Sequence, residues 1–230
     1  MVIKNSKMNI IVISLEKAKE RRERITKQLN SLNIDAVIMD AVDGRLLSDN
    51  QLNKTIHNPI GWRTGEKFKP GEIGCIMSHI KALNYAKEHN WEYAIILEDD
   101  IVLSEDFVKG IKFLFRILPQ NWEHVFLGGH IYMHAPPVFQ PSVEKVNFKV
   151  SGAYSYIVKN TIYDDLINEY LKIEIPVDDI IEMFTYRTSK IQSYIFFPFL
   201  VYPLLNYSYI WEEDSGGNLH PSFKYFKNKL

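Results

Sequence analysis

Short, nearly continuous apolar runs separated by helical periodicity constrain the fold of this chain more than any other feature. Residues 9–15 and 93–97 are such runs, and strands buried on both faces of a parallel sheet have this pattern. After the first run, Ile25, Leu29 and Leu32 recur at the spacing of one helix face. The alternation predicts an α/β domain in which a mostly parallel central sheet is flanked by helices through right-handed crossovers.

The rest of the chain continues this alternation less regularly. Residues 45–70 are polar, lack a clear period and predict a long functional loop. The remaining predicted elements are a strand at 36–39, a helix from Gly71, a helix capped by Ser104, strands at 125–127 and 154–158, a helix at 162–171, a loop at 176–179 leading into a short helix, and strand and turn within 194–205.

Chain length and overall charge limit the expected domain organisation and binding partners. A chain of 230 residues can hold one α/β core. Because no linker or repeat is visible, we expect a single domain over 1–230, with a nucleotide-sugar-binding half at 1–130 and an acceptor-side half at 131–230. The 27 basic and 28 acidic side chains nearly cancel, so the overall charge gives no reason to expect nucleic-acid binding.

Cysteine content and hydropathy favour a cytoplasmic setting. Cys75 is the only cysteine, so it has no partner for an internal disulfide, and its place in an apolar helix indicates packing. No run approaches the roughly 20 apolar residues that a transmembrane helix needs. Residues 223–230 mix aromatic residues with lysines, which predicts either a solvated tail or peripheral contact with the inner face of the cytoplasmic membrane.

Three consecutive acids, Glu98, Asp99 and Asp100, directly follow the apolar run at 93–97. Ligands of open α/β sheets collect at the carboxyl ends of the strands, and clustered carboxylates suit Mg²⁺ or Mn²⁺. If the strand continues, Glu98 and Asp100 share one side and Asp99 points elsewhere. Helix caps or solvated turn residues are the structural alternative. The spacing alone does not separate a sugar-nucleotide site from a phosphatase, nuclease or nucleotidyltransferase site.

Several segments in a fixed order resemble glycosyltransferase family 25, which includes bacterial lipopolysaccharide and lipooligosaccharide galactosyltransferases and collagen galactosyltransferases. Ser14 stands where the family often has asparagine, and Lys17 to Lys19 lack the arginine that the family often has there. The resemblance extends over most of the chain up to about residue 200. Its segments are 12–15 with 20–22, 41–44, 71–79 and 97–100, with weaker agreement at 152–154 and 176–178.

The resemblance implies a glycosyltransferase-A-like fold and inverting transfer of a hexose, with galactose expected, from a UDP-sugar. The implied acceptor is a lipooligosaccharide or lipopolysaccharide glycan, expected to be lipid-linked. A divalent cation, Mn²⁺ or Mg²⁺, would stabilise the departing diphosphate. Asp100 is the expected main metal ligand, together with Glu98.

The resemblance also implies roles for other residues. A base must take the proton of the acceptor hydroxyl, and Asp178 is the first choice and Asp179 the second. The alternative role of these two acids is to cap a helix that starts near Ile180. Asp43 could instead be only a turn residue, and Arg21 could instead be a solvated residue on an exposed helix face. The residues expected to contact the donor are Ser14, Leu15, Arg21, Asp43, Gly44, Ser78, His79, Glu98 and Asp99.

Two other classes of function remain open at this point. A metal-dependent phosphoryl or nucleotidyl transferase would use the same acids without a sugar acceptor. A non-catalytic glycan-binding module would use the 13 tyrosines and 4 tryptophans to stack on sugars, but it leaves the acidic triplet without a role.

Overall fold

The computed structural model describes residues 8–48, 68–131, 140–173, 175–188 and 190–204, with the backbone of 207–208 and 213–214. Most of the loop predicted at 45–70, and the whole basic tail at 223–230, lie outside the described residues.

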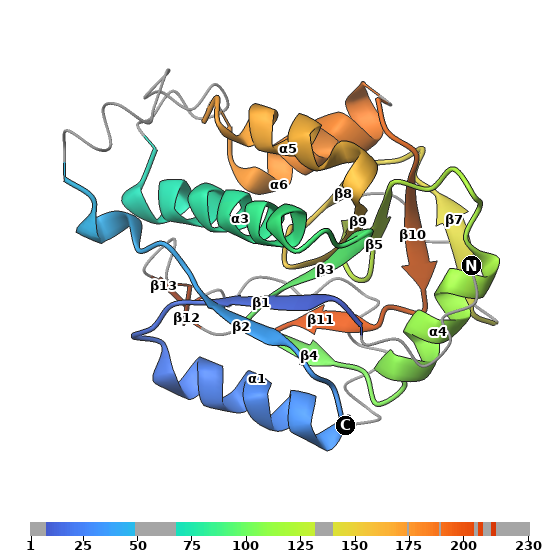
Figure 1. Ribbon diagram of the computed structural model, residues 1–230, viewed down its shortest axis with the longest axis horizontal. Helices are drawn as coiled ribbons and strands as arrows, with labels where there is room; N and C mark the ends of the chain where they lie inside the picture. The colour runs from blue at the N-terminus through green and yellow to red at the C-terminus, as the bar shows by residue number, and fades with distance from the viewer. Residues whose placement is uncertain are drawn as a thin grey trace.

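A seven-stranded sheet forms the centre of the molecule (Figure 1). Its strands, in spatial order, are β2 (Val37–Asp40), β1 (Ile10–Ser14), β3 (Tyr93–Glu98), β9 (Ser155–Lys159), β5 (His124–Phe126), β10 (Ser193–Phe197) and β7 (Ser142–Lys145).

The sheet is mixed but mostly parallel. β1 pairs in parallel with β2 and β3, and β5 pairs in parallel with β10. β9 lies antiparallel between β3 and β5, and β7 is antiparallel at one edge. Five of the seven strands therefore run in one direction, which confirms the predicted sheet. Strands β9 and β10 of the second half of the chain share this sheet with strands of the first half.

Helices cover both faces of the sheet (Figure 1). Helices α3 (Pro70–Glu88), α5 (Tyr163–Tyr170) and α6 (Val177–Glu182) lie on one face, while α1 (Lys19–Ser31) and α4 (Phe107–Ile117) lie on the other. The shorter elements are η1 (Gly44–Leu46), η2 (Asn160–Ile162), the π-helical turn η3 (Met183–Arg187), and three strand pairs: β4 (Ile101–Leu103) with β11 (Val201–Pro203), β6 (His130–Ile131) with β8 (Val150–Ser151), and β12 (Tyr207–Ser208) with β13 (Glu213–Asp214).

Strand β1 shows why its sequence is apolar throughout. Ile11 and Ile13 pack into the core on the side of α3, whereas Ile10 and Val12 pack into the core on the side of α1. Because successive side chains point to opposite faces, a strand between two helical layers needs apolar residues at every position. Burying each of these side chains contributes about 1.5–3 kcal/mol to folding.

Two predicted boundaries were wrong. Helix α4 begins at Phe107, and the hydroxyl of Ser104 accepts a hydrogen bond from the Asp106 N–H in the preceding turn, so Ser104 does not cap the helix. Helix α6 begins at Val177, directly after Pro176, so Asp178 and Asp179 lie in its first turn and not in a loop. Proline is tolerated at a helix start because its missing N–H would have no helical acceptor.

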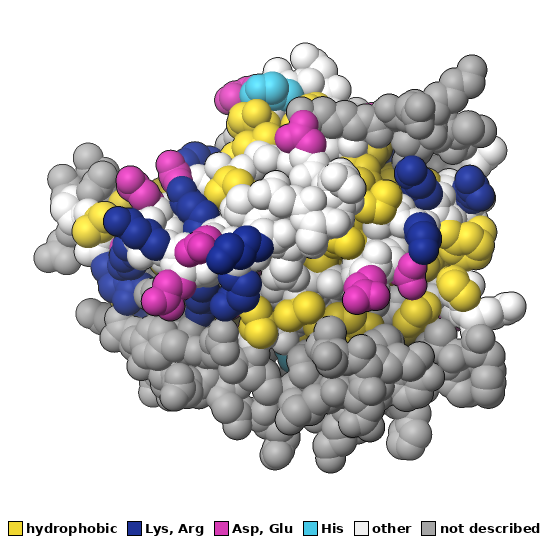
Figure 2. All heavy atoms as spheres, turned by 90° about the horizontal axis from the view of Figure 1, so that it is seen from below, with side chains coloured by type: hydrophobic (Ala, Val, Ile, Leu, Met, Phe, Trp, Pro, Cys, Tyr) yellow, Lys and Arg dark blue, Asp and Glu magenta, His cyan; other side chains and the backbone are white. Residues whose placement is uncertain are grey.

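Figure 2 views the molecule from the side of α1, where basic and acidic side chains are interspersed. Lys27 and Glu23, for example, form an ion pair 2.7 Å long one helical turn apart. Among the helices in the described part of the chain, none has the length and hydropathy needed to cross a bilayer.

Buried His124 predicts a loss of stability in acid. Burial lowers the pKa of His124 to about 3, and its Nδ1 lies 3.0 Å from the Ser193 hydroxyl. Unfolded histidine titrates near pH 6.5, so between about pH 6.5 and 3 only the unfolded chain gains this proton and stability falls with falling pH. In urea unfolding, the stability advantage of wild type over His124→Asn should shrink by about 2 kcal/mol from pH 7 to pH 5. A constant difference would contradict the burial of a neutral ring.

Candidate active site

The carboxyl ends of β1, β2 and β3 meet at one edge of the sheet (Figure 1). The acidic triplet lies there, because Glu98 is the last residue of β3. In the strand register, Ser14 pairs with Asp40, and Ile13 pairs with Glu98. A pocket of about 100 Å³ opens at this edge. The residues predicted from sequence that line it are Leu15, Arg21, Asp43, Gly44, Ser78, His79, Glu98, Asp99 and Asp100. Ser14, Asp178 and Asp179 are not among its lining residues.

Arg21 of α1 binds two acids of the triplet. Its Nη1 lies 3.3 Å from Oδ1 of Asp99 and 3.1 Å from Oδ2 of Asp100. The expectation that Asp99 points elsewhere than Glu98 and Asp100 depended on the strand continuing, and this condition is not met. The physical reason is that β3 ends at Glu98, so strand alternation does not extend to Asp99 and Asp100. Arg21 is also largely buried, so the alternative of a solvated arginine is not what the structure shows.

Ser14 fixes the position of the Asp99 side chain through a hydrogen bond. The buried Ser14 hydroxyl donates a 2.7 Å hydrogen bond to Oδ2 of Asp99. Arg22 in turn donates to the Ser14 carbonyl at 2.8 Å and to Asp40 at 2.7 Å. Ser14 was predicted to contact the donor directly, but its contacts are those of a residue that positions Asp99.

Burial and mutual repulsion disfavour the charged forms of Glu98 and Asp100. Burial and the neighbouring charges of Asp178 and Asp99 raise the pKa of Glu98 to about 8, against the opposing effect of Arg21. Burial and the charge of Glu98 raise the pKa of Asp100 to about 7, again opposed by Arg21. A cation that entered the pocket would offset the repulsion among these carboxylates and favour their charged forms.

The loop after β2 is fastened to helix α3. The hydroxyl of Ser78 accepts a hydrogen bond from the Val42 N–H at 2.8 Å and donates one to the Gly74 carbonyl at 2.6 Å. Gly44 and Gly74 then touch backbone to backbone. A Cβ on Gly74 would lie 2.5 Å from the Val42 carbonyl oxygen and 2.7 Å from the Gly44 nitrogen. These contacts explain why both positions need glycine, and they make one wall of the pocket.

Asp43 lies at the mouth of the same pocket. Its carboxylate accepts from the Arg45 N–H at 3.2 Å and forms an ion pair with Lys17. Burial acts to raise the pKa of Asp43, but the bonds to Lys17 and Arg45 outweigh it, and the net pKa is lowered. Asp43 is therefore both a turn residue and an ionised group facing the pocket.

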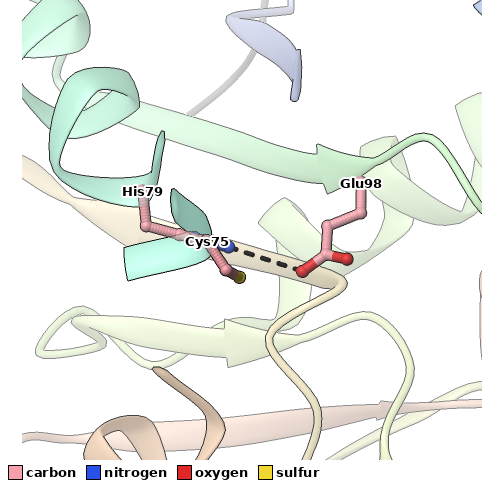
Figure 3. A group of neighbouring side chains, drawn as sticks. All are labelled: Cys75, His79 and Glu98. Atoms are coloured by element: carbon pink, nitrogen blue, oxygen red, sulfur yellow. Dashed lines mark ion pairs between the residues drawn. The ribbon is translucent and has the colours of Figure 1, made fainter. Parts of the chain in front are cut away.

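His79 brings a buried ring to the pocket from α3. Its Nδ1 lies 2.9 Å from the hydroxyl of Tyr156, and burial lowers its pKa to about 4, so the ring is neutral at physiological pH. On the other side, Nε2 lies 3.5 Å from Oε1 of Glu98 (Figure 3). Cys75, one turn earlier on α3, is half-buried and also lines the pocket.

The side chains of Cys75, His79 and Glu98 form a group that could hold a metal ion. Their ligand atoms all lie within 4.8 Å of one another (Figure 3). The interpretation of Cys75 as a packing residue overlooked this position. The spacing of Cys75 and His79, four residues apart on a helix, was the available signal because such residues share one face.

Asp178 and Asp179 lie in the first turn of α6 and are not among the residues that line the pocket. Asp178 is half-buried and accepts a 2.7 Å hydrogen bond from the Ala153 N–H, whereas Asp179 is buried. The helix begins before them, so neither occupies the N-cap position that their alternative role required. The charge of Asp178 nevertheless affects the site, since it raises the pKa of Glu98.

Comparison with known families agrees with this geometry. The family model described as glycosyltransferase family 25, LPS biosynthesis protein, matches residues 7–181. The chain therefore belongs to glycosyltransferase family 25. The expected fold, an α/β domain of the glycosyltransferase-A type with a mostly parallel sheet between helices, agrees with that membership.

Curated relatives include enzymes and a protein named as inactive. Human procollagen galactosyltransferase 2 is 30% identical over 154 residues, which are 64% of this chain and 24% of that protein. A rat protein named probable inactive glycosyltransferase 25 family member 3 is 30% identical over 166 residues, 66% of this chain and 28% of that protein. The chain thus spans about a quarter of the length of these relatives.

Among solved structures, the fold was matched to a glycosyltransferase involved in the glycosylation of the major capsid of PBCV-1. The TM-score is 0.46 at 10% identity, covering 81% of this chain and 80% of that one.

The contact between Gly44 and Gly74 predicts a cost for a single methyl group. Gly74→Ala should lower the free energy of unfolding by about 1–3 kcal/mol, because the new Cβ meets fixed backbone atoms. Gly110→Ala in α4 is the matched control, since the three atoms nearest to its Cβ would be side-chain carbons of Leu200, which can shift more easily than backbone atoms. Denaturant unfolding of both variants measures the difference, and equal stability of the two would refute the predicted contact.

Proposed function

We propose that this protein is an inverting glycosyltransferase that transfers a hexose, galactose in the first instance, from a UDP-sugar to a glycan acceptor. The observation that carries the proposal is the strand-end pocket of a family 25 chain, which Glu98, Asp99 and Asp100 line and in which Arg21 forms ion pairs with Asp99 and Asp100. Phosphoryl or nucleotidyl transfer and simple glycan binding are less well supported, because neither follows from membership of a glycosyltransferase family.

A divalent cation, Mn²⁺ or Mg²⁺, fits the oxygen donors of the triplet. The Asp100 and Glu98 side chains are 29% and 24% exposed, and both line the pocket, so their oxygens can be reached from solvent. Cations of this kind bind through one or two carboxylates and keep several waters. In this proposal Asp100 is the main ligand and Glu98 the second. The bound cation would supply charge stabilisation for the departing diphosphate.

Arg21 is proposed to hold the pyrophosphate beside that cation. Its guanidinium already faces the carboxylates of the pocket, and its planar donors match phosphate oxygens. Asp43, Leu15 and Gly44 border the other side of the pocket, and we assign them to the uridine and ribose. Ser78 has an indirect role in this proposal, because it fastens the loop that contains Asp43 to α3. We assign His79 to the donor sugar.

Asp178 is proposed as the base, with Asp179 as the second choice. Inversion requires a base that takes the acceptor proton from the side opposite the leaving diphosphate. Asp178 is half-buried next to the site and is oriented by the Ala153 N–H, whereas burial makes Asp179 less accessible. Both acids come from α6, on the sheet face that also carries α3.

The acceptor in this proposal is a lipooligosaccharide or lipopolysaccharide glycan, expected to be lipid-linked. The family description as an LPS biosynthesis protein supports this class, while the human relative is named for procollagen. A cytoplasmic location with peripheral contact at the inner membrane face follows from such an acceptor and belongs to the same proposal.

Calorimetry with UDP tests the metal assignment. Wild type should bind UDP more tightly with Mn²⁺ than without it, and Asp100→Asn should lose this gain because its main ligand charge is gone. Asp40→Asn is the matched control, since Asp40 lies at the same sheet edge but is 61% exposed, pairs with Arg22 and does not line the pocket. Equal Mn²⁺ dependence in wild type and Asp100→Asn would remove Asp100 from the metal site.

Turnover tests the base assignment. Asp178→Asn keeps an oxygen that can accept from Ala153 but loses the basic carboxylate. UDP release from UDP-galactose, with a lipooligosaccharide core as acceptor, should fall about 10²–10⁴-fold, while UDP affinity with Mn²⁺ stays unchanged. Asp179→Asn should have a much smaller effect. Wild-type turnover in Asp178→Asn would show that another group takes the proton.

A further inference from the structure

We propose that Cys75, His79 and Glu98 form a binding site for a thiolate-preferring divalent cation of the zinc class, separate from the cation proposed at Asp100. The first observation is their convergence from α3 and the end of β3, with all ligand atoms within 4.8 Å of one another (Figure 3). One sulfur, one imidazole nitrogen and one carboxylate oxygen make a mixed donor set. Such a set suits Zn²⁺, whereas Mg²⁺ and Mn²⁺ prefer oxygen donors.

The second observation is the unsatisfied nitrogen of His79. The ring is fully buried, and its Nε2 has no hydrogen-bond partner among the described residues. Buried polar atoms are rarely left without a partner, so this nitrogen needs a physical explanation. It faces Oε1 of Glu98 at 3.5 Å, which is too long for a good hydrogen bond. Two ligand atoms held about 2.1 Å from a tetrahedral ion lie about 3.4 Å apart, close to the observed separation.

Tyr156 prepares the ring for this role. Its hydroxyl lies 2.9 Å from Nδ1 of His79, and Tyr156 itself is fully buried on β9. When Nδ1 carries the proton and donates to Tyr156, Nε2 presents its lone pair to the gap. Histidine ligands of metals usually have such a partner on the other nitrogen, which fixes the tautomer and the orientation of the ring.

Cys75 would be the sulfur ligand, and it lies where a cation can reach the site from the pocket. It is half-buried and lines the pocket, so a cation can enter from there. Burial and the charges of Glu98, Asp178, Asp100 and Glu72 raise the pKa of the Cys75 thiol, so the metal-free protein holds a protonated sulfur. On binding, the thiol releases its proton to solvent and the sulfur bonds to the ion as thiolate.

Three protein ligands leave a fourth position of a tetrahedral ion open toward the donor pocket. Glu98 would then belong to two sites, and a zinc-class ion would hold it away from the cation at Asp100. This consequence rests on the proposed function, whereas the metal site itself does not.

Cobalt titration of the full chain tests the site directly. Because Cys75 is the only cysteine, a thiolate-to-cobalt absorption band in the near ultraviolet can come from no other residue. Wild type should show this band at one Co²⁺ per chain. Cys75→Ser should lose the band, and His79→Gln should bind Co²⁺ at least about 10-fold more weakly. A wild-type protein without the band, or a His79→Gln variant with unchanged affinity, would overturn the proposal.

Two further measurements separate this proposal from the proposed function. Asp100→Asn should keep the cobalt band even though it loses Mn²⁺-dependent UDP binding. Loss of the band in Asp100→Asn would show that there is one cation site, not two. Zn²⁺ should also protect Cys75 of the wild-type protein from iodoacetamide, a readout that needs no variant. Equimolar Zn²⁺ should weaken Mn²⁺-dependent UDP binding in wild type but not in Cys75→Ser, and equal weakening in both would disprove the competition for Glu98.

Discussion

The concentration of negative charge at the end of β3 is the constraint on which the site depends. Glu98 ends a strand that is buried on both faces, Asp99 and Asp100 follow it, and the guanidinium of Arg21 forms ion pairs with Asp99 and Asp100. Burial, and then the repulsion between neighbouring acids, raises the pKa values of Glu98 and Asp100. A cation bound there would relieve this repulsion and would face an anionic ligand that enters the pocket. The fold thus clusters acids at a place where the cation of a metal–diphosphate complex would compensate their charge.

The surrounding contacts keep this charge in a defined geometry. The buried Ser14 hydroxyl orients Asp99 from the neighbouring strand, so the position of one acid is fixed by the sheet register. On another wall of the pocket, the hydrogen bond of Ser78 and the close contact between Gly44 and Gly74 hold the loop after β2 against α3. The pocket is therefore shaped by backbone contacts that tolerate little change in side-chain size. Rigid support of this kind suits a site that must place a cation accurately.

Much of the fold could be predicted because burial on both faces of a sheet leaves a plain signal, as in the apolar runs that became β1 and β3. The position of the acidic triplet followed from the same rule. Contacts between distant segments left no such signal: the support of Asp99 by Ser14, and the approach of His79 to Glu98, depend on packing across the chain. The start of α6 also differs from the prediction, because proline is common both in loops and directly before a helix, and Pro176 immediately precedes this one.

The most direct test of the account is a crystal structure of the protein with UDP and Mn²⁺, using anomalous scattering to locate the manganese. A manganese peak is expected in the pocket at the ends of β1 and β3, bonded to Asp100 and to the diphosphate oxygens. A diphosphate bound elsewhere, or a manganese peak without contact to any acid from Glu98 to Asp100, would contradict it.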